Sequence, residues 1–98
     1  MKQEPIQIGH IVQSTQGRDK DRFLVVIDII DDEYALLVDG SLRRLDKPKK
    51  KKLKHFVSTG LASEEIRQRV LSEKKMNNAL IRVELERLTD NEPGENGE

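Results

Sequence analysis

The chain has 98 residues, of which 35% are hydrophobic and 37% are charged, and its formal net charge is zero. This length allows one domain, and the 28 Leu, Ile, Val and Phe residues are a larger share than a disordered chain carries. The absence of cysteine excludes disulfides, thiolate metal sites and cysteine catalysis, and the longest apolar run, 23–27, is far shorter than the roughly 20 residues of a membrane helix.

The zero net charge hides an uneven distribution of charge along the chain. Residues 42–56 include eight basic residues and one acidic residue, whereas residues 1–41 include four basic and eight acidic ones. Residues 84–98 include one basic and six acidic ones. A concentrated block of positive charge creates a local potential that the isoelectric point of the whole chain does not reveal. The sequence therefore predicts a segment that binds a polyanion near the middle of the chain.

A β-hairpin is predicted at the start of the chain. The runs Ile8–Gln13 and Phe23–Ile30 are rich in β-branched residues, and the polar loop between them is centred on Gly17, a residue that adopts positive φ without steric cost. Gly9 interrupts the first strand pattern and predicts a β-bulge. The second strand is apolar on both faces, so we expect the C-terminal segment to cover one of them.

Three further strands are predicted before the pattern changes. Tyr34–Val38 reads as the third strand, and Asp39-Gly40 is a two-residue hairpin signal that leads into a fourth strand at Ser41–Leu45. Leu53–Val57 is the predicted fifth strand. Five short strands with glycine-marked turns predict a small SH3-like β-barrel over residues 1–59.

From Leu61 onward the apolar residues follow a helical spacing. Ser63 precedes Glu64 and Glu65 as a predicted N-cap with an acidic first turn, and Asn77 or Asn78 marks a second helix start. We expect two short amphipathic helices within residues 60–88, with their apolar faces on the second strand. Residues 89–98 are predicted to be a disordered acidic tail, which either competes with the polyanion for the basic segment or only improves solubility.

The aromatic side chains give no signal of base stacking, and the histidines give no signal of metal binding or catalysis. Phe23, Tyr34 and Phe56 are expected to pack in the core or at its rim, because platforms that stack nucleic-acid bases usually present several exposed aromatics. His10 and His55 have no partner at metal-ligand spacing. We therefore expect no catalytic residue, no metal site, no cofactor and no small-molecule substrate.

The strongest functional signal is the basic segment RRLDKPKKKKLKH, residues 43–55. Pro48 has a fixed φ and no N–H, so we expect this segment to be an extended loop between strands. Lysine ammonium groups bind phosphate oxygens without regard to sequence. A solvated charged face and a nuclear-localisation signal are the alternatives for such a run. The candidate residues for binding a polyanion are Gly17, Arg18, Lys20, Arg22, Arg43, Arg44, Lys47, Lys49, Lys50, Lys51, Lys52, Lys54 and His55.

The spacing of glycine, apolar and basic residues in the first hairpin resembles a KOW motif. The residues that carry this likeness are Gly9, Val12, Gly17, Lys20, Phe23 and Val25, and Asp21 stands where many KOW motifs have a second glycine. The longer run GRDKDRFLVVIDIIDDEYALLVDGSLRRL, followed by KKLKHF, resembles small bacterial KOW-domain RNA-binding proteins. These are related to the large-subunit ribosomal protein of the fourteen-e type. The resemblance spans about Ile8 to Val57 and implies an SH3-like barrel that binds ribosomal RNA in translation.

Together these signals predict a cytoplasmic RNA-binding protein, ribosomal or ribosome-associated, with no enzymatic activity. It is expected to contact the backbone of ribosomal RNA through the Gly17 loop and the lysine-rich segment, with ribosomal proteins as further partners and no membrane partner. The alternative is a protein-interaction module that binds a transcription or translation factor, in which the lysines serve as an anchor or a targeting signal.

Overall fold

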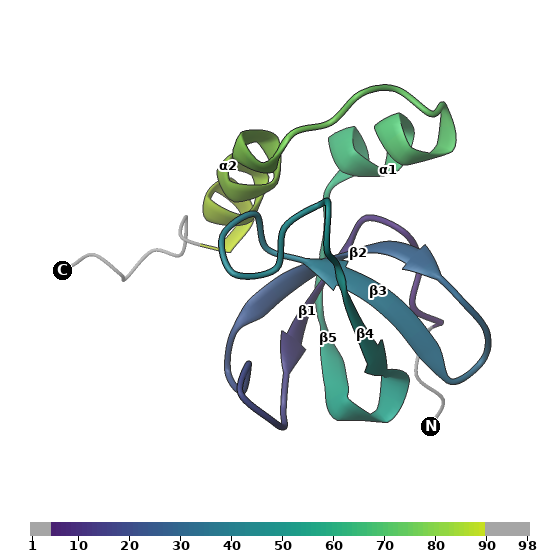
Figure 1. Ribbon diagram of the computed structural model, residues 1–98, viewed down its shortest axis with the longest axis vertical. Coiled ribbons are helices and arrows are strands. Elements are labelled where there is room, and N and C mark those ends of the chain that lie inside the picture. The colour runs from purple at the N-terminus through teal and green to yellow at the C-terminus, as the bar shows by residue number, and fades with distance from the viewer. Residues whose placement is uncertain (1–4, 90–98) are drawn as a thin grey trace, which may run out of the picture.

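The structure, a computed structural model, describes residues 5–89 and is mainly β (Figure 1). Within this range, five strands form one sheet and two helices follow it. The elements are β1 (His10–Ser14), β2 (Phe23–Ile29), β3 (Tyr34–Val38), β4 (Lys49–Lys52), a 3₁₀ turn (Leu53–His55), β5 (Phe56–Ala62), α1 (Glu64–Leu71) and α2 (Asn78–Thr89). The prediction of a mainly β chain with two C-terminal helices is confirmed.

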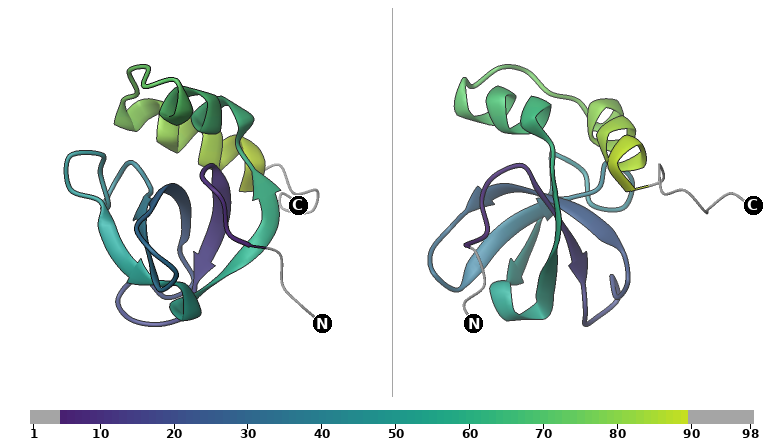
Figure 2. Two further views of the ribbon diagram at one scale, coloured as in Figure 1. Left: turned by 90° about the vertical axis from the view of Figure 1, so that its right-hand side faces the viewer. Right: turned by 180° about the vertical axis from the view of Figure 1, so that it is seen from behind.

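The sheet is antiparallel throughout, with the strand order β4-β3-β2-β1-β5. Among the described residues, the end strands β4 and β5 are not paired with each other, so the sheet is not closed into a barrel. Figure 2 shows that the sheet is strongly curved and that both helices lie together on one side of it. The β1–β2 hairpin and the third strand agree with the sequence prediction, and the other strands need correction.

The predicted fourth strand at Ser41–Leu45 is wrong. One oxygen of the Asp39 carboxylate, Oδ1, accepts hydrogen bonds from the backbone N–H groups of Ser41 and Arg43, each at 2.8 Å. These hydrogen bonds close a compact turn where a two-residue hairpin was predicted. In a strand, the two N–H groups would instead donate to a neighbouring strand, but here the Asp39 side chain accepts from both. The chain then passes Pro48, and the fourth strand is formed by Lys49–Lys52.

The predicted fifth strand, Leu53–Val57, is also wrong in its bounds. Leu53–His55 form the 3₁₀ turn, and β5 begins at Phe56 and continues to Ala62. The sheet thus extends beyond residue 59, where the sequence placed its end. The predicted acidic tail, 89–98, begins one residue too early, because Thr89 belongs to α2. Its remaining residues, 90–98, lie outside the described residues.

The prediction of a bulge at Gly9 is wrong, and the register of the sheet shifts instead between β1 and β5 and between β2 and β3. The register between β1 and β5 shifts after Ile11, and the β5 side of the shift includes Gly60 at a φ of +84°. Gly9 lies in a turn before β1, at a φ of +92°, and an added Cβ there would lie 2.8 Å from the carbonyl oxygen of Ser63. Gly9 therefore allows the start of α1 to approach the sheet closely, and β1 begins at His10 and not at the predicted Ile8.

The two faces of β2 are buried in two separate hydrophobic clusters. On one face Val25 packs with the helices, in a cluster of Ile11, Val25, Val38, Ile66, Ile81 and Leu85. On the other face lies a cluster of Val12, Leu24, Val26, Ala35, Leu37 and Phe56, all from the sheet. Each fully buried aliphatic side chain contributes about 1.5–3 kcal/mol. The expectation that the helices cover one face of the second strand is confirmed.

Both predicted helix starts are capped by side chains. Ser63 Oγ accepts a hydrogen bond from the N–H of Ile66 at 3.1 Å, and Asn77 Oδ1 accepts one from the N–H of Leu80 at 2.8 Å. These contacts satisfy N–H groups that have no partner within the helix. The cap residues therefore fix where α1 and α2 begin.

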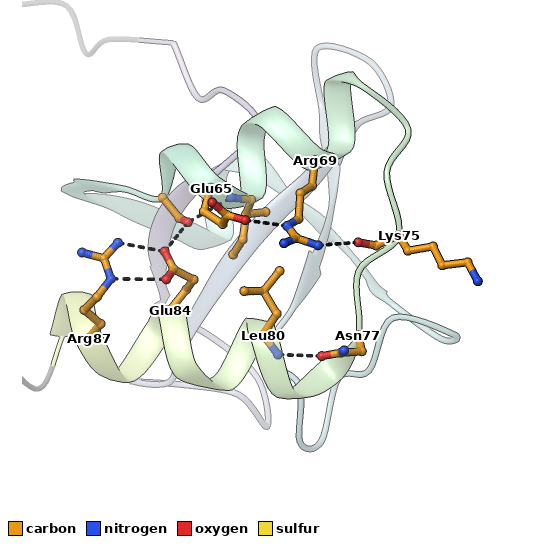
Figure 3. A network of polar contacts seen from close by, with 9 residues as sticks. Glu65, Arg69, Lys75, Asn77, Leu80, Glu84 and Arg87 are labelled. Atoms are coloured by element: carbon orange, nitrogen blue, oxygen red, sulfur yellow. Dashed lines mark hydrogen bonds and ion pairs between the residues drawn. The ribbon is translucent and has the colours of Figure 1, made fainter.

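A buried carboxylate, Glu84, connects the two helices (Figure 3). Its Oε1 accepts a hydrogen bond from Ser63 Oγ at 2.7 Å, and Arg87 donates to both of its oxygens at 2.8 and 3.2 Å. The hydrogen bond from Arg87, supported by that from Ser63 and opposed by burial, holds the pKa of Glu84 below its usual range. The charge of Glu84 is thus compensated by the same contacts that tie α2 to the cap of α1.

Candidate nucleic-acid interface

The central part of the basic segment is an edge strand. The prediction of an extended loop over residues 43–55 is wrong for Lys49–Lys52, which pair with β3 as β4. Because successive side chains of a strand point to opposite faces, Lys49 and Lys51 share a face with Ala35 and Leu37, whereas Lys50 and Lys52 share one with Tyr34 and Leu36. The strand therefore divides four consecutive lysines into an inner pair and an outer pair.

Lys51 belongs to the interior of the protein. Its residue is 8% exposed, and its Nζ donates a hydrogen bond to the carbonyl oxygen of Gln16 at 2.9 Å. Loss of solvation lowers the pKa of Lys51, the nearby Asp19 carboxylate acts in the opposite direction, and Lys49 and Arg43 lower it further. Lys51 thus attaches the Gly17 loop, residues 15–22, to β4 and is not available to an external phosphate.

Arg43 is held by a second contact with the same loop. Its Nε and Nη2 donate to one oxygen of Asp19, Oδ2, at 3.1 and 3.0 Å, and the Asp19 residue is only 2% exposed. Arg22 has a longer contact with a second buried carboxylate, at 3.5 Å from Nη1 to Oδ2 of Asp39. Two buried carboxylates therefore compensate the charges of Arg43 and Arg22.

The backbone of the Gly17 loop adopts two positive φ angles. Gly17 has a φ of +85°, as its position in the predicted loop requires, and Asp21 has a φ of 72°. A positive φ is uncommon for residues other than glycine, although Asp and Asn tolerate it best. The loop is further closed by hydrogen bonds from Lys20 N to Gly17 O at 3.2 Å and from Asp21 N to Ser14 O at 2.8 Å. Arg18 and Lys20 therefore extend from an ordered loop.

The remaining predicted cations lie on β4, in the segments directly before and after it, and in the Gly17 loop, with the acidic Asp46 among them. Because Gln16 and Asp19 contact β4 and the segment before it, the loop residues Arg18 and Lys20 are held beside the lysine strand. Their side chains, like those of Arg44, Lys47, Lys50 and Lys54, are exposed, and Lys49 and Lys52 are partly exposed. We call these residues the basic surface: Arg18, Lys20, Arg44, Lys47, Lys49, Lys50, Lys52 and Lys54. None of them forms an ion pair with any residue between 5 and 89.

The structure thus separates the predicted site residues into two groups. In the first group, Arg43 and Lys51 stabilise the fold through their internal contacts, and Arg22 forms an ion pair with Asp39. His55 also belongs to it, because it is partly buried and its backbone oxygen accepts a hydrogen bond from Thr15 N at 2.9 Å. The other predicted cations lie on the basic surface. Sequence reasoning did not assign Asp19 and Asp39 their role as internal counter-charges. The alternation of acid and base from Arg18 to Arg22 was the one available signal for Asp19, whereas Asp39 was interpreted only as a turn residue.

The three aromatic residues have different environments. Phe56 is 4% exposed and lies in the core as predicted, whereas Phe23 is 37% exposed at the end of β2. Tyr34 is partly exposed on the outer face of β3, where the Nζ atoms of Lys50 and Lys52 lie 4.7 and 5.9 Å from the centre of its ring. Tyr34 is therefore the one aromatic side chain that adjoins the basic surface.

Within residues 5–89, no group of three or more His, Asp or Glu side chains is placed to hold a metal ion. In the same range, no helix is both long and apolar enough to cross a membrane. His10 Nδ1 accepts a weak hydrogen bond from the N–H of Gln7 at 3.3 Å.

No protein-family model matches the chain, and no curated protein matches it.

Proposed function

We propose that the protein binds RNA through the basic surface, with an affinity that comes mainly from contacts with phosphates. The observation that carries the proposal is the difference between the two groups of cations. Arg43 and Lys51 are compensated from inside, while the lysines around them have no acidic partner within residues 5–89. Neutralising phosphates with such lysines releases condensed counterions, and this release drives association.

The lysines of β4 could also serve only to keep an exposed sheet edge from pairing with another chain. That role requires charges on the edge strand itself. It does not account for the exposed Arg18, Lys20 and Arg44, which lie outside the strand and beside it. A nuclear-localisation signal is less compatible with the fold, because an extended peptide would have to leave the sheet and expose Lys51.

We further propose that the sheet is an SH3-like barrel of the KOW type, open between β4 and β5, and that the RNA is ribosomal. Support comes from the likeness of residues 8–57 to KOW-domain proteins and from the strand order. It also comes from Asp21, which stands at a motif position that is often glycine and adopts a φ of 72°, in the region that glycine favours. The loop backbone therefore has a shape that the motif's glycine would allow.

The test is a pair of double variants with the same change of charge. Lys50→Gln with Lys54→Gln removes two cations from the basic surface, and Lys74→Gln with Lys75→Gln removes two equally exposed cations from the connection between α1 and α2. Counterion release makes each phosphate contact about eightfold more favourable at 0.1 M salt than at 1 M salt. Loss of two contacts should therefore weaken the binding of a ribosomal RNA fragment by the first variant about 60-fold at 0.1 M salt. The second should change affinity little. Equal losses in both variants would contradict the proposed surface.

One observation favours the alternative, a protein-interaction module. Phe23 and Val57 are 37% and 46% exposed, and together with Leu61 and Thr89 they line a hollow of about 320 Å³. Co-sedimentation with large ribosomal subunits separates the two functions. Binding that is lost in high salt supports contact with RNA, whereas binding that persists in high salt and is lost in Phe23→Ser supports a protein partner.

A further inference from the structure

The outer face of β3 and β4 carries the single tyrosine of the chain next to two lysines. Tyr34 is directly opposite Lys52 across the two strands, and Lys50 lies diagonally from it. The Nζ of Lys50 is 4.7 Å from the centre of the tyrosine ring, and that of Lys52 is 5.9 Å from it. The three side chains therefore present a flat aromatic surface and two flexible cations at one place.

We propose that Tyr34, Lys50 and Lys52 form a binding site for an unpaired nucleotide of RNA. The base stacks on the tyrosine ring, and the two lysines contact the phosphates on either side of the nucleotide. This inference rests on the proposed RNA binding and adds to it that the bound RNA has a single-stranded element at this point, since a paired base has no free face to stack on the ring.

In the free protein the lysine ammonium groups adjoin the ring of Tyr34, and a stacking base would have to replace them there. An exposed lysine over an aromatic ring gains about two- to fivefold in association, whereas a base stacked on an aromatic side chain gains about 5- to 150-fold. A base can therefore replace the lysine ammonium on the ring. Lys50 and Lys52 lose little in the exchange, because each long side chain can turn from the ring to an adjacent phosphate.

The turn before Tyr34 gives the site a rigid boundary. Asp31 Oδ1 accepts hydrogen bonds from the N–H groups of Glu33 and Tyr34 at 2.8 and 2.9 Å, and the N–H of Leu53 donates to Glu33 O at 2.8 Å. A hollow of about 200 Å³ is lined by Asp32, Glu33, Lys52, Leu53 and Lys54, which are the residues just before β3 and those at and after the end of β4. The acidic side of this hollow repels phosphates, so the RNA backbone is directed along the lysine side.

The hollow also indicates which bases fit. Carboxylates such as those of Asp32 and Glu33, both exposed, accept hydrogen bonds from exocyclic amino groups. Cytosine, guanine and adenine carry exocyclic amino groups that can donate to a carboxylate, whereas uracil has only carbonyl oxygens at the corresponding positions. The site should therefore prefer these three bases over uracil, to a smaller degree than it prefers unpaired over paired RNA.

Tyr34 can be observed directly because the chain has one tyrosine and no tryptophan. Protein labelled with 3-fluorotyrosine gives one fluorine NMR resonance, which is titrated with oligocytidine, with an RNA duplex of equal length and with inorganic polyphosphate. Oligocytidine should shift the resonance upfield by the ring current of the stacked base. Polyphosphate, which binds lysines but has no bases, should not produce that upfield shift.

Affinity measurements on variants give an independent test. Tyr34→Leu should weaken the binding of oligocytidine about 5- to 150-fold, and Tyr34→Phe, which keeps the ring, should retain most of it. Both variants should bind polyphosphate as the unchanged protein does. Phe23→Leu, at the other exposed aromatic position, is the matched control and should bind oligocytidine normally.

The outcomes distinguish this site from the proposed function. If Tyr34→Leu binds oligocytidine like the unchanged protein, or if polyphosphate and oligocytidine shift the resonance alike, the stacking site is wrong while RNA binding remains. If the unchanged protein binds neither oligocytidine nor duplex, RNA binding itself is wrong. Should Tyr34→Leu fail to fold, the fluorine resonance of the labelled protein decides the matter without it.

Discussion

Replacing Lys51 by methionine should destabilise the protein, whereas the same replacement at Lys50 should not. Lys51 is 8% exposed and its Nζ donates to Gln16 O at 2.9 Å, while Lys50 is exposed one position earlier in the same strand. Methionine keeps the length of the apolar stem, so the change removes mainly the charge and the hydrogen bond. The pair therefore compares an internal lysine with an external one in the same sequence context.

The expected loss follows from the contacts of Lys51. A hydrogen bond from a charged donor contributes about 1.5–3 kcal/mol. The lower part of this range applies, because burial opposes the charge of Lys51, as its lowered pKa indicates, and because Gln16 O keeps a second donor, Ser14 Oγ at 3.0 Å. A loss of about 1.5 kcal/mol should lower the melting temperature by about 6–12 °C in a chain of this size. At Lys50 the change should stay within about 0.5 kcal/mol.

Thermal denaturation followed by circular dichroism measures the difference. Binding of RNA at low temperature should show the reverse order: Lys50→Met loses one phosphate contact and Lys51→Met loses none, so only Lys50→Met should reduce the salt slope, by about 0.9. Two variants that melt within about 2 °C of each other would refute the assignment of Lys51 to the interior.

Further predictions concern the buried carboxylates and the glycines. Asp19→Asn should lower the free energy of unfolding in urea by about 1.5–3 kcal/mol, since it leaves Arg43 without its charged partner, whereas the exposed Asp46→Asn should change it little. The pKa of Glu84 is lower in the folded protein, so its ionised carboxylate stabilises the fold fully above pH 4.5, the ordinary value, and this contribution is lost as the pH falls through the folded pKa. Glu84→Gln should therefore flatten the acid side of a plot of unfolding free energy in urea against pH. Gly9→Ala should melt well below Gly60→Ala, because both glycines have positive φ but only Gly9 approaches α1. Gly17→Val, at a φ of +85°, should lose RNA affinity more than an exposed loop change does, and normal binding by a folded Gly17→Val would contradict the role of the loop.

Local signals predicted the elements whose structure is decided locally. Tyr34–Val38 has strand-forming residues and became β3 with the same bounds, and Ser63 has the cap chemistry that starts α1. Lys49–Lys52 carried no such signal, because lysine has little preference for strands. Its strand is decided by pairing with β3, a contact that the sequence pattern did not reveal.

The candidate site was predictable in its residue types and less so in their roles. The basic segment identified most cations of the surface, yet it could not separate Lys51 from its neighbours. The four lysines are identical in sequence and differ in which face of β4 they occupy and, for Lys49 and Lys51 on the same face, in how deeply they are buried. The partner of Arg43 lies 24 residues away, in the Gly17 loop, and only the folded chain brings the two together.

The most direct test of the central claim is the salt dependence of RNA affinity. The association constant for a structured fragment of ribosomal RNA is measured between about 50 and 400 mM salt, the range in which the counterion effect is large. If six of the eight cations of the basic surface contact phosphates, the logarithm of the constant should fall with the logarithm of salt concentration with a slope of about −4 to −5. A slope near zero, or the absence of binding at the lowest salt, would contradict the proposal that this protein recognises RNA through its exposed lysines.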